Sequence, residues 1–214
     1  SDANYLFISD SNTNRILQFN LDGSGVPLDY LADRVVGQLD FLTAGSGTTN
    51  KTLSGPTGLA IDPSHSRLFV SDSTNNRIMV FTYPCSANGI PADAVIGQGS
   101  FATSNAANPP SATRLSAPQG LDYDILNDRL IVADSGNSRV LFYNLAGGLS
   151  TFSQAADVEL GLALLSGVDS SDPFDSNFPG LSQSEMSYPQ DVAYDEGHQS
   201  LYVSDTANNR VLIF

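Results

Sequence analysis

The sequence predicts an all-β fold of four repeated units, on the basis of three observations. One phrase, typified by LFVSDSTNNRIMVF from Leu68 to Phe81, occurs four times along the 214 residues. The apolar runs are short and bounded by Gly, Pro, Asn, Asp or Ser, which is typical of strands. No window has the spacing of apolar residues that a helix needs. A repeat at this period predicts supersecondary units that pack against one another.

The arginine of the repeated phrase gives the period. The four copies place it at Arg15, Arg77, Arg139 and Arg210, so that successive copies are 62, 62 and 71 residues apart. In each copy two apolar runs flank a polar turn of the form D-[ST]-x-N-x-R, with Thr13 in place of the asparagine in the first copy. The phrase therefore predicts a hairpin of two strands, which we call b and c.

Each unit is expected to contain two further strands. A proline-containing segment such as GPTGLAID, from Gly55, precedes the phrase and predicts strand a. A segment such as ADAVIGQGSF, from Ala92, follows it and predicts strand d. We expect 14 strands of four to six residues, in units of approximately 1–52, 53–114, 115–185 and 186–214. Four antiparallel strands per unit predict the blades of a β-propeller, with incomplete blades at both ends.

The turn and the segment after it resemble a known family. The D-[ST]-x-N-x-R turn resembles the NHL-repeat family of β-propellers, and the ADxVxGQxxF segment is similar to a bacterial subset with longer units. Leu162 departs from the pattern, because it stands where Gln38 and Gln98 are found. The resemblance covers nearly the whole chain and implies the propeller fold. It implies no single activity, since the family includes protein-binding, RNA-binding and enzymatic members.

Composition restricts the partners. The chain has 23 acidic and 9 basic residues, and its formal net charge is −14 at pH 7. This charge repels phosphate backbones and anionic lipids, so we expect no nucleic acid partner. No apolar run approaches the roughly 18 residues that a membrane helix needs, so we expect no membrane insertion. The aspartate-rich, lysine-poor composition favours an extracellular or periplasmic location. Cys85 stands alone, so no internal disulfide is expected, and we expect a buried thiol.

The polar turn has two interpretations. The aspartate can accept backbone N–H groups, and the arginine five positions later can reach a carboxylate or a carbonyl of an adjacent blade. On this interpretation the structural clamps are Arg15, Arg77, Arg139 and Arg210. The alternative is a ligand site that the turns form together with aromatic side chains on the long loops of the same face. The candidate ligand-binding residues are Asp72, Asn75, Asp134, Asn137, Asp205, Asn208, Phe41 and Phe101.

One group of aspartates is a candidate metal site. Asp169, Asp172 and Asp175 recur every third residue in the longest connection. Their carboxylates suit Ca²⁺, although the spacing differs from that of a calcium-binding loop, and a solvated loop is the alternative. Beyond Ca²⁺, no cofactor is expected.

The a strands end in a second group of acidic residues. Asp62, Asp124 and Asp195 are expected to be turn residues or, alternatively, a ring of carboxylates that attracts a cation near the channel mouth. The two histidines of the chain, His65 and His198, occupy matching positions in the hairpins that follow. We expect both to be exposed turn residues.

The expected function is a non-catalytic binding or scaffold module that recognises a protein or small-molecule ligand on its loop-bearing face. The sequence contains no P-loop, HExxH or GxSxG motif. The alternative is a metal-dependent hydrolase or lyase, with Ca²⁺ or Zn²⁺ held at the central channel by Asp and Asn side chains of several blades.

The incomplete terminal blades allow several ways of closing the ring. Closed propellers have about four to eight blades. The four units could close alone, two chains could pair, or the natural protein could be longer. We expect an arc of a larger ring that self-association completes as a homo-oligomer, because unpaired strand edges favour further pairing.

Overall fold

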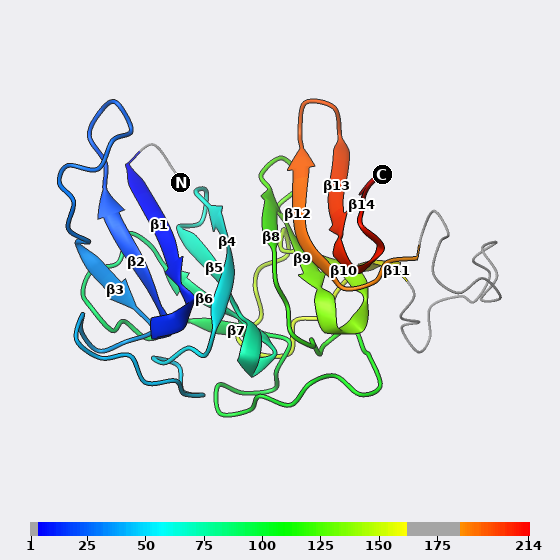
Figure 1. Ribbon diagram of the computed structural model, residues 1–214, viewed down its shortest axis with the longest axis horizontal. Coiled ribbons are helices and arrows are strands. Elements are labelled where there is room, and N and C mark those ends of the chain that lie inside the picture. The colour runs from blue at the N-terminus through cyan, green and yellow to red at the C-terminus, as the bar shows by residue number, and fades with distance from the viewer. Residues whose placement is uncertain (1–3, 162–184) are drawn as a thin grey trace.

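The computed structural model describes residues 4–161 and 185–214 of the chain. These residues form four antiparallel sheets with 14 strands, and helical residues are confined to four 3₁₀ turns. The predicted all-β fold is confirmed. Figure 1 shows the four sheets side by side, in the order of the sequence. No helix in the described ranges has the length and apolar character needed to cross a membrane.

Each sheet is one blade. The first blade contains β1 (Tyr5–Asp10), β2 (Arg15–Asn20) and β3 (Arg34–Val36). The second blade contains β4 (Pro56–Asp62), β5 (Arg67–Asp72), β6 (Arg77–Thr82) and β7 (Ala94–Ile96). The third blade contains β8 (Leu121–Asp124), β9 (Arg129–Asp134), β10 (Arg139–Asn144) and β11 (Val158–Gly161). The fourth blade contains β12 (Pro189–Asp195), β13 (Ser200–Asp205) and β14 (Arg210–Ile213).

Two of the three d strands are shorter than the sequence predicted. β3 and β7 have 3 residues each. Both are followed at once by a glycine with positive φ, Gly37 at 83° and Gly97 at 88°. Such a φ lies outside the β region, so pairing stops there. A Cβ on either glycine would also collide with a leucine side chain, of Leu53 and Leu115 respectively.

A 3₁₀ turn joins strands b and c in every blade. The four turns are η1 (Ser11–Thr13), η2 (Ser73–Asn75), η3 (Ser135–Asn137) and η4 (Thr206–Asn208). The residue after each turn is left-handed, with φ between 52° and 56°, and three of the four are asparagine, which tolerates this region. The residue after that is the arginine of the repeated phrase, which opens strand c. The turn therefore fixes the arginine beside the aspartate that ends strand b.

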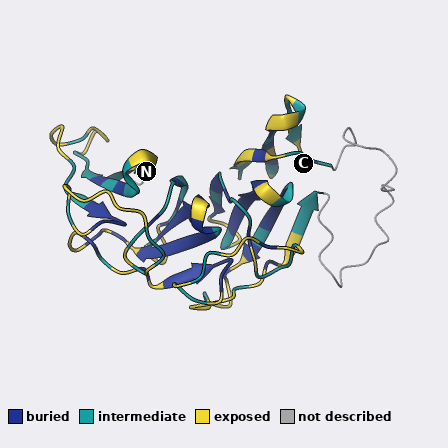
Figure 2. Ribbon diagram, turned by 60° about the horizontal axis from the view of Figure 1, so that its bottom comes forward, coloured by how far each residue is buried: buried dark blue, intermediate teal, exposed yellow. Residues whose placement is uncertain are grey.

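The blades form an arc. The innermost strands contact one another in series, β1 with β4, β4 with β8, and β8 with β12. Figure 2 shows the first and fourth blades at the two ends of this arc. The hairpins between strands a and b lie along one edge of the blades, and the 3₁₀ turns lie along the opposite edge (Figure 1).

Glycine permits the close approach of neighbouring innermost strands. A Cβ on Gly58 of β4 would lie 2.2 Å from the carbonyl oxygen of Gln119. A Cβ on Gly120 would lie 2.3 Å from Oδ1 of Asp191 in β12. Gly120 also donates its N–H to the Gln190 carbonyl at 2.9 Å, so a backbone hydrogen bond joins the third and fourth blades.

The hydrophobic core lies between the blades. One cluster joins the first and second blades, another the second and third, and another the third and fourth. Within β5 the faces alternate, since Leu68 and Val70 face the first blade and Phe69 faces the third. Each blade thus buries the apolar faces of its neighbours, which is the physical reason for the repeat.

Cys85 lies in the cluster between the first two blades and is a free, buried thiol. Burial raises the pKa of its thiol to about 12. Because thiolate is the reactive form, we expect no reaction with Ellman's reagent at pH 8 until the protein unfolds. Thiol release in a denaturant series should follow the loss of the β signal in circular dichroism. Rapid reaction of the native protein would contradict this packing.

Self-association stays a prediction. Tyr202, Val211 and Ile213 of the fourth blade expose apolar side chains, and Ile8 of the first blade does so as well. Burial of these side chains would favour contact between chains. We expect light scattering to give a mass above 22.6 kDa that falls with dilution. Val211→Asp should shift the equilibrium to the monomer; a monomer at all concentrations would refute association.

Candidate functional site

The polar turns of the blades hold buried ion pairs, of which the pair at Arg77 is the most complete. Nε of Arg77 donates to Oδ2 of Asp72 at 2.6 Å, and both side chains are fully buried. Nη1 donates to the Phe101 carbonyl at 2.5 Å, and Nη2 donates to the carbonyls of Thr49 and Thr52 at 3.1 Å each. Thr49 and Thr52 belong to the connection that enters the blade, and Phe101 to the connection that leaves it. One guanidinium therefore ties both connections to the turn.

The same geometry recurs in the other blades. In the third blade, Nη2 of Arg139 donates to the carbonyls of Ser111 and Arg114 at 2.9 Å each, again in the incoming connection. In the first blade the arrangement is looser, because both partners are partly exposed. The Nε–Oδ2 distances are 2.7 Å for Arg139–Asp134, 2.6 Å for Arg210–Asp205 and 2.9 Å for Arg15–Asp10.

The aspartates and asparagines of the candidate ligand set lie within these networks. Asp72 accepts the backbone N–H of Ser54 at 2.6 Å and the amide of Asn75 at 2.8 Å, in addition to Arg77. The same amide bonds the Gly47 carbonyl at 2.8 Å. Corresponding amide bonds join Asn137 to Asp134 and Asn208 to Asp205. The structure gives these residues internal partners, and ligand binding by them stays a prediction.

The balance between burial and hydrogen bonding differs among the carboxyl groups. Burial raises the pKa of Asp72 and of Asp134, although the neighbouring arginines oppose it. At Asp205 burial also acts to raise the pKa, but hydrogen bonds from Ser187, Asn208 and Arg210 outweigh it and leave the pKa below its usual value.

The turns also bond to the next blade. The Ser73 hydroxyl donates to the Pro118 carbonyl at 2.5 Å, and the Oδ1 atom of Asn76 accepts the Ala117 N–H at 2.8 Å. The Ser11 and Ser135 hydroxyls make the matching bonds to Pro56 and Pro189. Residues of the repeated turn thus form hydrogen bonds that join each blade to the next.

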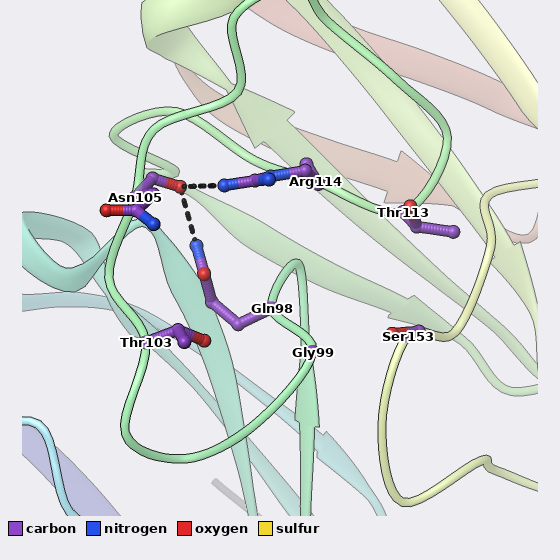
Figure 3. A pocket seen from close by; sticks show the side chains of 7 residues that line it. All are labelled: Gln98, Gly99, Thr103, Asn105, Thr113, Arg114 and Ser153. Carbon is purple, nitrogen blue, oxygen red and sulfur yellow. Dashed lines mark hydrogen bonds between the residues drawn. The ribbon is translucent and has the colours of Figure 1, made fainter.

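A polar pocket of about 290 Å³ opens between the second and third blades, and we call it the rim pocket. Figure 3 shows the Asn105 carbonyl accepting hydrogen bonds from Gln98 at 2.9 Å and from Arg114 at 3.2 Å. The β7–β8 connection supplies most of the lining, and the β10–β11 connection supplies one residue. The lining residues are Gln98, Gly99, Thr103, Asn105, Thr113, Arg114 and Ser153.

Arg114 differs electrostatically from most arginines of the chain. Six of the eight arginines form ion pairs with carboxylates in the described part of the chain, whereas Arg114 and Arg34 form none. Arg114 is exposed in the pocket, and the one hydrogen bond of its guanidinium in the described ranges goes to the Asn105 carbonyl. A guanidinium presents five N–H donors, so most of this capacity remains available to a ligand.

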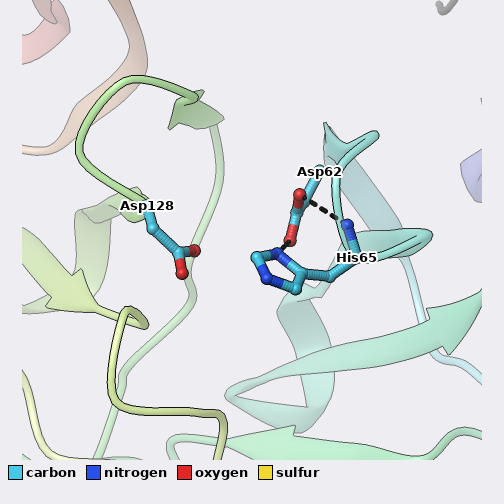
Figure 4. A group of neighbouring side chains, drawn as sticks. All are labelled: Asp62, His65 and Asp128. Atoms are coloured by element: carbon cyan, nitrogen blue, oxygen red, sulfur yellow. Dashed lines mark hydrogen bonds and ion pairs between the residues drawn. The ribbon is translucent and has the colours of Figure 1, made fainter.

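A second cluster lies at the opposite edge of the blades, and we call it the hairpin cluster. It consists of Asp62 and His65 in the β4–β5 hairpin and Asp128 in the β8–β9 hairpin, whose ligand atoms lie within 4.8 Å of one another. Figure 4 shows His65 between the two carboxylates. Nδ1 of His65 lies 2.8 Å from Oδ2 of Asp62. Arg67 approaches both carboxylates, at 3.4 Å from Asp62 and 3.9 Å from Asp128.

The remaining predicted site residues are placed as follows. Phe41 is exposed. Phe101 packs edge-to-face against Phe152, with ring centroids 5.3 Å apart, in the connections that also form the rim pocket. Asp169, Asp172 and Asp175 lie outside the described residues.

Sequence comparison with known families agrees with the repeated turn. Residues 186–214 match the NHL repeat. The chain carries an NHL repeat and has a β-propeller fold. Among curated proteins, no sequence matches this NHL-repeat chain.

Solved structures with the same fold include proteins of different roles. A functionally unknown protein from Desulfotomaculum acetoxidans DSM 771 is 16% identical, with a TM-score of 0.53, and the match covers 99% of the NHL-repeat chain and 51% of that protein. A streptogramin B lyase is 14% identical, with a TM-score of 0.53 and coverages of 99% and 48%. A chain of a nidogen/laminin complex is 18% identical, with a TM-score of 0.56 and coverages of 99% and 55%. The NHL-repeat chain spans about half the length of these proteins.

Sequence reasoning missed the two clusters that the fold assembles. Arg114, Thr113 and Ser153 occupy no repeated position, and Ser153 comes from a different connection. Asp128 likewise falls outside the repeated pattern of aspartates. For the hairpin cluster the sequence did single out Asp62 and His65, but not their proximity to Asp128.

Removing one partner of a buried ion pair leaves a buried charge uncompensated, so we expect Arg77→Ala to destabilise the fold by about 3–5 kcal/mol. Arg15→Ala is the matched control, because its pair with Asp10 is partly exposed and should cost about 1 kcal/mol or less. In thermal unfolding, Arg77→Ala should lower Tm by on the order of 10 °C and Arg15→Ala by a few degrees. Equal shifts would exclude burial as the source of the difference.

Proposed function

We propose that the NHL-repeat chain is a non-catalytic binding module whose rim pocket recognises a carboxylate-bearing ligand through Arg114. The observation that carries this proposal is an exposed guanidinium without a carboxylate partner, in a chain of net charge −14. Such a chain offers many carboxylates that could neutralise an arginine, yet none pairs with Arg114 in the described residues. Arginine binds carboxylates with two parallel hydrogen bonds, which gives geometric specificity as well as energy.

The rest of the pocket supports recognition of a polar molecule. Thr113, Ser153 and Asn105 are among the lining residues, and the side chain of each carries groups that can donate or accept a hydrogen bond. The connections are held to the blades by internal hydrogen bonds, such as the one from Gln98 to the Asn76 carbonyl at 3.0 Å. A pocket on connections held in this way loses little conformational entropy on binding.

The volume of the pocket limits the part of the ligand that it can enclose. About 290 Å³ is at the lower end of the range for small-molecule sites, which suits one acidic sugar or one amino-acid residue. Phe152 is partly exposed next to Ser153, and it offers an apolar surface for the remainder of a larger ligand. The ligand is therefore a small acid or a protein segment that presents a carboxylate. The acidic composition supports an extracellular or periplasmic setting for such binding.

A metal-dependent hydrolase or lyase is the second candidate. The hairpin cluster favours it, because an imidazole and two carboxylates are a common set of metal ligands. Turnover of ester, lactone or sugar substrates by the purified protein would support this candidate and overturn the non-catalytic proposal.

Ligand-observed NMR against a panel of carboxylates tests the proposed function. The panel contains citrate, glutamate, galacturonate and a short peptide with a free carboxyl terminus. We expect at least one of them to bind, and its carboxamide or methyl ester to bind at least about tenfold more weakly, because the charge-assisted bonds are lost.

Two variants assign such binding to the rim pocket. Arg114→Ala should weaken binding by at least about tenfold. Lys51→Ala removes the same charge from an exposed position that does not line the pocket, and it should leave binding unchanged. Equal losses in both variants would indicate a general charge effect and refute the pocket. Absence of binding across the panel would refute the carboxylate class.

A further inference from the structure

The hairpin cluster brings together three side chains from two blades. Asp62 ends β4, His65 lies three residues later in the same hairpin, and Asp128 comes from the β8–β9 hairpin of the next blade. Their ligand atoms lie within 4.8 Å of one another. In the tetrahedral geometry that zinc prefers, two ligand atoms each about 2.0–2.2 Å from the metal are about 3.4 Å apart. Small side-chain movements therefore suffice to place all three on one ion.

Each member of the cluster is oriented by the protein. The Asp62 carboxylate is fully buried and accepts the His65 backbone N–H at 3.1 Å. The imidazole of His65 is held against Asp62, yet about half of its side chain remains exposed, so an ion can reach it from solvent. The Tyr123 hydroxyl donates to Asp128, which fixes the third group. Such supporting hydrogen bonds are typical of metal sites, where they orient the ligands.

Arg67 supplies an independent observation. Its Nη1 atom is buried and has no hydrogen-bond acceptor within the described ranges, although it lies near both carboxylates. Its contacts with the two carboxylates are ion pairs without hydrogen-bond geometry, and a water oxygen on a bound cation would accept the hydrogen bond that Nη1 lacks. The positive charge of Arg67 also reduces the attraction of the cluster for any cation. The cluster is thus suited to moderate and reversible binding.

We propose that Asp62, His65 and Asp128 bind a divalent first-row transition metal, with Zn²⁺ as the preferred ion. Imidazole nitrogen with two carboxylate oxygens is a donor set for zinc and its neighbours, whereas Ca²⁺ takes oxygen ligands. The bound ion would join the second and third blades at the edge opposite the turns and the rim pocket. This inference does not depend on the proposed function, because it concerns different residues at the other edge of the blades.

The fourth blade contains a matched control. Nδ1 of His198 lies 2.6 Å from Oδ2 of Asp195, which repeats the pair of His65 and Asp62. No third carboxylate joins that pair in the described part of the chain. In the third blade Asn127 stands in the position of the histidine. The proposal therefore predicts zinc binding at His65 and not at His198.

Isothermal titration calorimetry with Zn²⁺ alone, on chelator-treated and untagged protein, provides the test. We expect one equivalent of Zn²⁺ to bind the wild type and to raise Tm. His65→Gln and Asp128→Asn should each weaken binding by more than about tenfold, and His198→Gln should leave it unchanged. Ca²⁺ at the same concentration should not displace Zn²⁺ from the cluster.

Three outcomes would overturn the proposal. They are no saturable Zn²⁺ binding to the wild type, wild-type affinity in Asp128→Asn, and equal losses in the two histidine variants. Circular dichroism and the metal-free Tm of each variant show whether it is folded. The side chain of His65 is substantially exposed, so His65→Gln remains informative even if a change at Asp128 disturbs the hairpin.

Discussion

The structure depends on the buried ion pair in the turn between strands b and c. A carboxylate and a guanidinium without exposed surface cost much desolvation energy, and they are tolerated only when every hydrogen-bonding group has a partner. Asp72 and Arg77 meet this condition with backbone groups from two connections that are distant in sequence. The pair therefore acts as an anchor for segments that have little regular structure of their own. The long connections can then vary in sequence while their path stays fixed.

The strands and their pairing were predictable, because they follow from periodic apolar residues that repeat with a fixed step. The faces of β5 followed directly from the alternation at Leu68, Phe69 and Val70. The lengths of β3 and β7 were not predictable in this way, since a glycine is compatible with a strand until its φ is known. The 3₁₀ form of the turns likewise depends on backbone angles that composition leaves open.

The candidate sites were less predictable than the fold, for a physical reason. The repeated polar residues are repeated because each blade needs the same internal bonds, and so they mark architecture. The rim pocket and the hairpin cluster instead arise where residues of two blades meet, and each includes a residue that differs between the repeats, Arg114 in the pocket and Asp128 in the cluster. In a chain with strong internal repetition, the candidate sites are thus completed by residues that differ from one repeat to the next.

Two glycines, one in β4 and one directly before β8, affect the curvature of the arc of blades. Gly58 and Gly120 let adjacent backbones come closer at the inner side than any side chain would allow, while full-sized residues keep the outer strands apart. That difference in spacing makes each blade a wedge, and the wedge angle determines how many blades fit around one axis. Widening the inner side by a single methyl group at each junction would flatten the arc, so that a complete turn would need more blades. The absence of side chains at Gly58 and Gly120 thereby helps to set the curvature of the arc.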